Sequence, residues 1–167
     1  MLGAAELDAQ PLRHLFDADL EFRDAMDAIT GAAGRQGRLI GSGDGFVEGE
    51  RISGQLTWTL FEELEETVAV IDHVLLISTA DGAVVRFDAQ GFAHRRSASD
   101  RLWNVVGALL FATDDPRYRW IDGSLGLWRG HYDTALRRAR YRAYESMVAP
   151  PSAVSVPAAA ASGEGVA

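Results

Sequence analysis

Two aspartates lie in segments where a carboxylate could do chemistry. Asp72 stands in the middle of the apolar segment VAVIDHVLLIS, where an unpaired carboxylate is costly to bury. If it lines a cavity away from water, its pKa rises and it can exchange a proton near neutral pH. The simpler alternative is a carboxylate paired with an arginine or with backbone donors. The sequence leaves both open.

Asp122 is the second candidate, because Tyr118 and Trp120 precede it at the same strand parity. Aromatic walls with one acid suit a flat hydrophobic ligand. The alternative is an ordinary aromatic core with the aspartate at a turn before Gly123. If Asp72 and Asp122 face one cavity, their mutual repulsion separates their pKa values and gives an acid and a base.

Arg86 could stabilise negative charge that develops on a substrate. It shares a strand parity with Asp88, so an ion pair within the sheet is the simple alternative. The sequence has no cysteine, and its four histidines show no zinc-ligand spacing. We therefore expect no metal and no cofactor. The absence of a Gly-x-Ser-x-Gly segment also gives a hydrolase triad no support.

These residues must be positioned by one domain. The 167 residues, 47% of them apolar, suffice for one core. We predict a single domain over residues 1–148 and a disordered Ala/Pro/Ser-rich tail over 149–167. The net charge of −8 argues against nucleic acid and anionic membranes as partners. Without a signal segment or a long apolar span, the protein is expected to be cytoplasmic.

The pattern along the chain is mostly that of strands. Residues 15–22 alternate between polar and apolar types. Asp81-Gly82 joins two β-branched runs as a hairpin turn. Less regular segments are expected as follows: a helical turn and loop over 23–38, a solvated connector over 61–66, a short helix running into a strand over 97–113, a strand with bends over 118–132, and either a helix or a strand over 135–145.

Four glycines stand in the segment GDGFVEGERISG, Gly43 to Gly54. A phosphate-binding loop needs a following Lys and Ser or Thr at a helix start, and neither follows here. Glycine within a strand pattern marks a bulge, a bend or a close backbone approach. Many short strands with such bends predict an all-β fold, a closed antiparallel β-barrel.

Three segments resemble a known family in order and spacing: GDGFVEGERISGQL, IDHVLLISTADGAVVRFDAQG and LFATDDPRYRWIDGSLGLWRG. They are similar to the domain-of-unknown-function family 3237, over about residues 11–145. The resemblance implies a barrel of the allene oxide cyclase, dirigent and calycin-like type with an apolar cavity. Asp72 matches the recurrent aspartate of that family and Trp58 is a plausible match to its loop tryptophan. Asp44 and Asp122 stand where the family has glycine and asparagine.

The sequence thus predicts a cofactor-independent isomerase, cyclase or hydratase/dehydratase-type lyase for a small hydrophobic oxygenated metabolite. Asp72 and Asp122 would move a proton, and Arg86 would stabilise negative charge. Trp58, Tyr118 and Trp120 would stack on the ligand. One alternative is a protein that binds or steers such a ligand without chemistry. Another is an oligomeric assembly module, because residues 68–78 are apolar on both strand parities.

Overall fold

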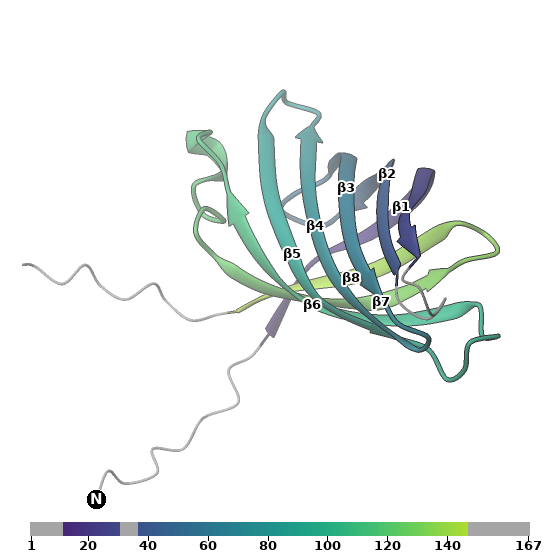
Figure 1. Ribbon diagram of the computed structural model, residues 1–167. Helices are drawn as coiled ribbons and strands as arrows, with labels where there is room; N and C mark the ends of the chain where they lie inside the picture. Colours follow the sequence, from purple (N-terminus) through teal and green to yellow (C-terminus); the bar gives the residue numbers. More distant parts are fainter. Residues whose placement is uncertain (1–11, 31–36, 147–167) are drawn as a thin grey trace, which may run out of the picture.

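Eight antiparallel strands follow one another around a closed barrel, and the last strand pairs with the first (Figure 1). The computed structural model describes residues 12–30 and 37–146, with side chains for 12–23 and 40–146. The strands are β1 (Leu12–Thr30), β2 (Gly37–Glu48), β3 (Gly54–Leu64), β4 (Val68–Thr79), β5 (Val84–His94), β6 (Leu102–Ala112), β7 (Leu125–Asp133) and β8 (Arg138–Ser146). The predicted closed antiparallel barrel is confirmed, while the tail over 149–167 lies outside the described residues.

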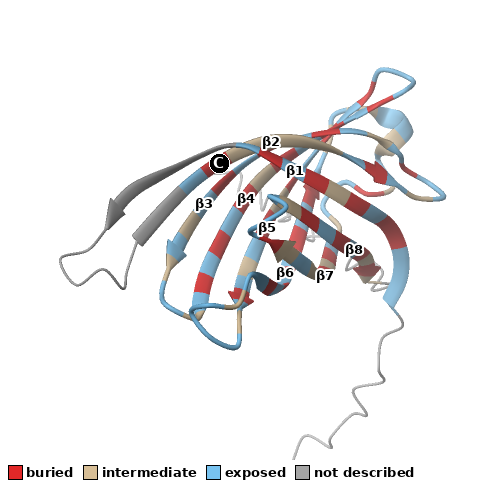
Figure 2. Cartoon of the chain, turned by 90° about the vertical axis from the view of Figure 1, so that its right-hand side faces the viewer, coloured by how far each residue is buried: buried red, intermediate tan, exposed pale blue. Residues whose placement is uncertain are grey.

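Alternation of side chains decides which residues fill the barrel. In β4, Ile71, His73 and Leu75 point inward, and the residues between them point outward. The same period of two produces the buried and exposed bands along the strands in Figure 2. The outer face of β4 keeps exposed apolar residues, including Val70 at 46% exposure. In the single chain, this strand is therefore buried on one face only.

The hairpin at Asp81-Gly82 forms as predicted. Gly82 has a φ of 84°, which glycine adopts without strain. Its N–H donates to the carbonyl of Thr79 at 3.0 Å. The Thr79 hydroxyl also accepts from the N–H of Ala83 at 3.0 Å, so both sides of the turn are held.

Several local predictions were wrong, and the open choice between helix and strand over 135–145 is decided. For residues 23–30 and 61–64 the reason is that strand pairing overrides local propensity. Residues 23–30 continue β1 and pair with β2 up to Thr30 opposite Gly37. Residues 97–101 form no helix, and 61–64 belong to β3. Pro116–Tyr118 is a 3-10 helix followed by turns up to β7. The ambiguous segment near the end is the strand β8.

One end of the barrel interior is filled by large apolar side chains. We call it the filled half; it lies next to the loops 49–53, 80–83 and 113–124. Its fully buried residues are Phe16, Ile52, Ile77, Val85, Phe87, Phe111 and Ile121. The rings of Phe87 and Phe111 lie 5.3 Å apart between centroids. This half has the close packing of an ordinary core.

A buried ion pair belongs to the same end. Glu145 is 6% exposed and accepts a hydrogen bond from the Nε of Arg13 at 2.5 Å. Arg51 lies 3.5 Å from the same carboxylate oxygen, and its guanidinium stacks over the ring of Trp120 at 3.5 Å. The buried carboxylate therefore has two cationic partners, as a desolvated charge requires.

Candidate functional site

The other end of the interior is lined by aromatic and polar side chains, and we call it the aromatic half. His73 lies between two tryptophans, with ring centroids 6.0 Å from Trp58 and 5.7 Å from Trp128, both edge-on. Trp128 stacks on Tyr141 at 4.2 Å, and Trp58 packs on Phe22 at 4.3 Å. These side chains come from β1, β3, β4, β7 and β8. The arrangement packs aromatic rings on one another around one buried imidazole.

Glycines on neighbouring strands make room for the two indoles. Gly43 of β2 is paired with Trp58, and a Cβ on Gly43 would lie 2.6 Å from the indole ring. Gly107 of β6 is paired with Trp128, and a Cβ there would lie 2.9 Å from the indole nitrogen. Within the glycine-rich segment, Gly43 therefore marks a close approach, as its place in a strand predicts.

His73 is a buried polar group without a protein partner. The residue is 1% exposed, and neither ring nitrogen has a hydrogen-bond partner among the residues that the structure describes. The Nε1 of Trp58 is also buried without a described partner. Burial lowers the pKa of His73 to about 3, so the imidazole is neutral at physiological pH. Such groups are rare in native interiors and need an explanation.

Glu62 places a carboxylate at the same end. It shares the inward face of β3 with Trp58 and Leu60. Burial raises the pKa of Glu62 to about 7. Burial, and to a lesser extent the charge of Glu62, raise the pKa of the hydroxyls of Tyr132 and Tyr141. The prediction that residues 61–66 form a solvated connector was wrong here, because β3 continues through Glu62 and turns its side chain inward.

Solvent reaches this half of the interior. Glu62, Leu64 and Tyr132 are only partly buried, although their strands direct them toward the inside. They lie near the strand ends that meet the loops 65–67 and 134–137. By contrast, the core residues of the filled half are at most 2% exposed. A carboxylate with a pKa about 7, near the solvent-reached end of an aromatic interior, can accept a proton from a bound molecule.

The structure places Asp72 and Arg86 away from this interior. Asp72 is exposed on the outer face of β4, across from Phe61 and Gln90. The expectation that it lines a cavity is corrected, because the odd-numbered residues of β4 face inward. Arg86 is exposed on β5, and its guanidinium binds both carboxylate oxygens of Asp88 at 3.0 Å. That ion pair is the simpler of the two arrangements predicted for it.

The residues predicted to share a strand with Asp122 lie in helical and turn structure instead. Asp122 is exposed and accepts a hydrogen bond from the N–H of Thr113 at 3.1 Å. Tyr118 packs partly against the core, and its hydroxyl donates to Asp81 at 3.3 Å. The ring of Trp120 lies under the guanidinium of Arg51. Of the six predicted site residues, Trp58 alone faces the aromatic half, so the structure does not bring the six together.

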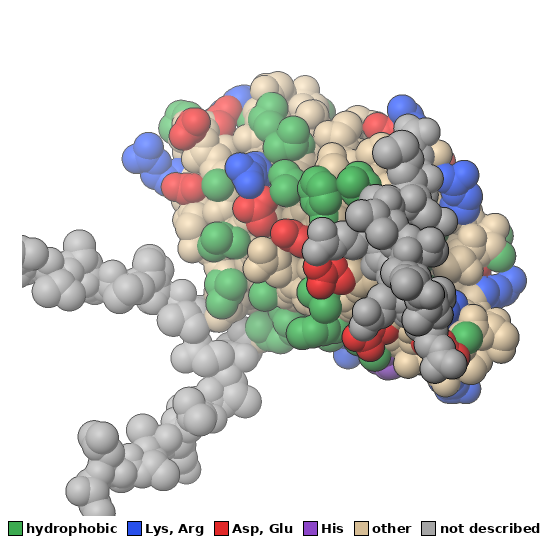
Figure 3. All heavy atoms as spheres, viewed as in Figure 1, with side chains coloured by type: hydrophobic (Ala, Val, Ile, Leu, Met, Phe, Trp, Pro, Cys, Tyr) green, Lys and Arg blue, Asp and Glu red, His purple; other side chains and the backbone are tan. Residues whose placement is uncertain are grey.

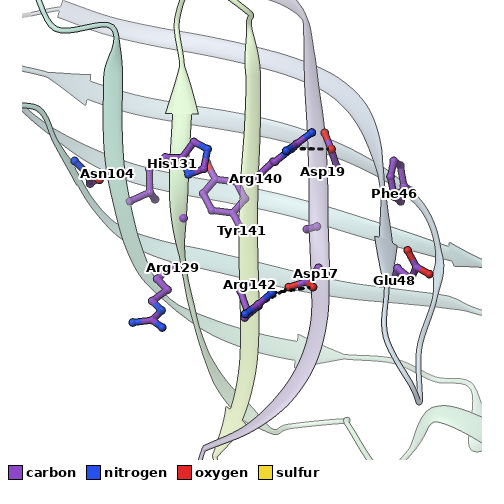
Figure 4. A pocket seen from close by; sticks show the side chains of 13 residues that line it. Asp17, Asp19, Phe46, Glu48, Asn104, Arg129, His131, Arg140, Tyr141 and Arg142 are labelled. Carbon is purple, nitrogen blue, oxygen red and sulfur yellow. Dashed lines mark hydrogen bonds and ion pairs between the residues drawn. The ribbon is translucent and has the colours of Figure 1, made fainter.

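The outer surface has a groove of about 680 Å³ across β1, β2, β6, β7 and β8 (Figure 4). Charged side chains point into it, and several are paired with one another. Arg142 donates to Asp17 at 2.8 Å, and Arg140 donates to Asp19 at 3.3 Å. Exposed pairs of this kind contribute about 0–1 kcal/mol and are typical of a solvated face. We therefore place the candidate site in the interior.

Within residues 12–30 and 37–146, no group of three His, Asp or Glu side chains is arranged to hold a metal ion. The described part of the chain contains no helix that is long and apolar enough to cross a membrane. Figure 3 shows hydrophobic side chains spread over one outer face among acidic ones. The surface on that side is thus mixed in character.

Comparisons with known proteins support the fold. No protein-family model and no curated protein matches the chain. Among solved structures, the chain is similar to a β-barrel-like protein from Acinetobacter baumannii AYE, with a TM-score of 0.69, 18% identity, and coverage of 81% of this chain and 94% of that one. It is also similar to a conserved protein of unknown function from Rhodopseudomonas palustris, with a TM-score of 0.69, 20% identity, and coverage of 81% and 96%.

A third similar structure is described as an enzyme, from Penicillium herquei, with a TM-score of 0.59, 20% identity, and coverage of 81% and 94%. At these identities the likeness shows the fold alone. The resemblance to the family of unknown function 3237 therefore stays a prediction. What the comparisons and the structure show together is a closed β-barrel that is similar to a β-barrel-like protein, a protein of unknown function and an enzyme.

Proposed function

We propose that the aromatic half binds a small hydrophobic oxygenated metabolite and catalyses a proton transfer on it, with Glu62 as the general base. The reaction would be an isomerisation, a cyclisation, or the addition or loss of water. These classes need a positioned carboxylate and a shaped apolar site, and they proceed without a redox group. Glu62 takes the place of the carboxylate pair that the sequence predicted.

The observation behind this proposal is the position of Glu62 inside the barrel. Its carboxylate lies on the same strand face as Trp58 and near Tyr132 and Tyr141. Burial brings its pKa to about 7, where a group serves best as a base at neutral pH. A purely structural carboxylate is held like Glu145, between two arginines. The presence of an enzyme among the structural relatives is compatible with this proposal.

The test uses metabolite extract from the source cells. The native protein and the Glu62→Gln variant are each incubated with extract, and the retained and changed small molecules are identified by mass spectrometry. We expect both proteins to retain the same compound and only the native protein to convert it. A product of unchanged mass indicates isomerisation or cyclisation, and a difference of one water indicates a lyase.

Three results would contradict the proposal in different ways. Retention of a compound with equal conversion by both proteins would remove Glu62 from the chemistry. Retention without any conversion would favour a binding or steering protein, the alternative that the sequence left open. If neither protein retains a compound, the interior is not a ligand site.

A further inference from the structure

We infer that the substrate is a carbonyl compound that enolises in the barrel, its oxygen held by N–H groups of Trp58 and His73 while Glu62 removes a proton from the adjacent carbon. This inference rests on the proposed function and specifies its substrate class. It starts from the polar atoms of the aromatic half that lack a protein partner.

Trp58 and His73 together offer two N–H donors and one acceptor to a ligand. The indole of Trp58 has a donor and no acceptor. A neutral imidazole has one donor and one acceptor, and His73 is neutral because it is fully buried. Two N–H donors buried among aromatic rings are complementary to a single oxygen with two lone pairs, which a carbonyl provides. The remaining nitrogen of His73 accepts from a substrate hydroxyl or a water.

The N–H donors and Glu62 belong to two neighbouring strands, β3 and β4. Trp58 and Glu62 are four residues apart on one face of β3, so their Cα atoms lie on the order of 13 Å apart. His73 belongs to β4 and is paired with Leu60, midway between them. The ring centroids of Trp58 and His73 lie 6.0 Å apart. A molecule of a few rings or fewer would span from these donors to Glu62.

The reaction is a proton transfer at the carbon next to the carbonyl. The Glu62 carboxylate takes a proton from the carbon next to the carbonyl, and the electron pair of the broken C–H bond forms a carbon–carbon double bond. The carbonyl π electrons move to oxygen, where the two N–H groups stabilise the new negative charge. The proton on Glu62 then returns to the same or another carbon, so no oxidant or co-reactant is needed. A neutral imidazole can serve as such an electrophile.

The experiment uses two probes of the same shape, the enolisable ketone β-tetralone and the hydrocarbon tetralin. Binding is followed by tryptophan fluorescence, the carbonyl stretch of the bound ketone by infrared spectroscopy, and exchange of its benzylic protons by NMR in deuterated water. The proteins are the native chain, Trp58→Phe, His73→Phe, Glu62→Gln and the control Trp120→Phe, which changes a tryptophan of the filled half. Circular dichroism confirms that each is folded.

We expect the native protein and the control to bind the ketone more tightly than the hydrocarbon and to lower its carbonyl stretch. Trp58→Phe and His73→Phe should each reduce that preference roughly three- to tenfold, as loss of one hydrogen bond does. Glu62→Gln should keep the preference and the lowered stretch but lose the accelerated exchange.

Equal binding of both probes, with the same carbonyl stretch in the native protein and in Trp58→Phe, would overturn the inference while leaving the interior as a ligand site. A lowered stretch without accelerated exchange in the native protein would overturn the enolisation. If neither probe binds and the extract experiment also retains nothing, the proposed function itself fails.

Discussion

The two halves of the barrel interior are enclosed by the same strands, but they differ in whether their buried polar groups have partners. In the filled half, the buried carboxylate of Glu145 has Arg13 and Arg51 as partners. In the aromatic half, His73 and the indole nitrogen of Trp58 have no partner among the described residues. Buried polar groups left unpaired reduce stability. This difference is expected if one half holds the fold together and the other binds a ligand, as we propose.

The two inward-facing glutamates test this comparison most directly. Glu62→Gln should lower the rate of proton transfer by about 10²- to 10⁴-fold, the usual contribution of a general base. Glu145→Gln should leave the rate unchanged and lower the free energy of unfolding by about 1–3 kcal/mol, because its arginines lose a charged partner. Exchange kinetics with β-tetralone and urea unfolding measure the two effects. Equal effects of the two substitutions would remove the distinction between the halves.

The pH dependence of the proton-transfer rate tests the role of Glu62 in a second way. Glu62 acts as a base only when it is ionised, and its pKa is about 7. The rate should therefore rise through about pH 7 and level off above it. A rate that does not change between about pH 5 and about pH 8 would assign the base to another group.

Removing a large side chain from the filled half should mainly affect stability. Phe111 is 1% exposed and packs against Phe16 and Phe87. Phe111→Ala should lower the free energy of unfolding by about 3–5 kcal/mol and leave ligand binding intact below the new melting temperature. Phe22→Ala in the aromatic half serves as the matched variant. It should weaken probe binding more and stability less, and the reverse order would contradict the comparison.

Replacing the unpartnered imidazole should raise stability while weakening binding. His73→Phe removes a buried polar group and should increase the free energy of unfolding at neutral pH by about 1–3 kcal/mol. In the native protein, burial lowers the pKa of His73 from 6.5 to about 3. Between these pH values the unfolded chain binds a proton that the folded chain does not. Stability should therefore fall as the pH decreases, by up to about 1.4 kcal/mol per pH unit.

The His73→Phe variant lacks the contribution of His73 to the pH dependence of stability. All other titrating groups are shared by the variant and the native protein. Urea unfolding at about pH 7 and about pH 5 isolates the difference. If both proteins lose the same stability over this interval, His73 is not a desolvated neutral group. A variant less stable than the native protein would show instead that the imidazole is well satisfied.

The fold could be predicted from the sequence because barrel strands alternate and their turns are distinctive. The alternation from Phe16 to Phe22 and the Asp81-Gly82 turn both have the predicted structure. Leu15 departs from this alternation, because it is buried beside Phe16 where the pairing of β1 with β8 shifts register. The residues after Arg23 did not show their strand structure, because it comes from their pairing with residues 37–42 of β2 and not from a strict alternation of their own. A strand that depends on its neighbour has little local signal.

The candidate site was harder to predict because it depends on which parity faces inward. Residues 68–78 are apolar at both parities, so the segment itself does not identify its buried face. If the even-numbered residues of β4 faced inward, Asp72 would line the interior. The odd-numbered residues face inward instead, so His73 lines it. The inward face of β3 could have been found from Trp58 and Leu60, which extend the same parity to Glu62. Tyr141 could not, because the segment around it fits a helix as well as a strand.

The smallest effects should come from the two carboxylates first singled out in the sequence. Asp72 and Asp122 are both exposed, so Asp72→Asn and Asp122→Asn should each change the free energy of unfolding by less than about 0.5 kcal/mol. Neither should alter the rate with β-tetralone, measured beside Glu62→Gln. Their catalytic roles stay predictions until this measurement. If Asp72→Asn lost activity while remaining folded, the chemistry would lie on the outer face of β4, and the aromatic half would be only a less well packed part of the core.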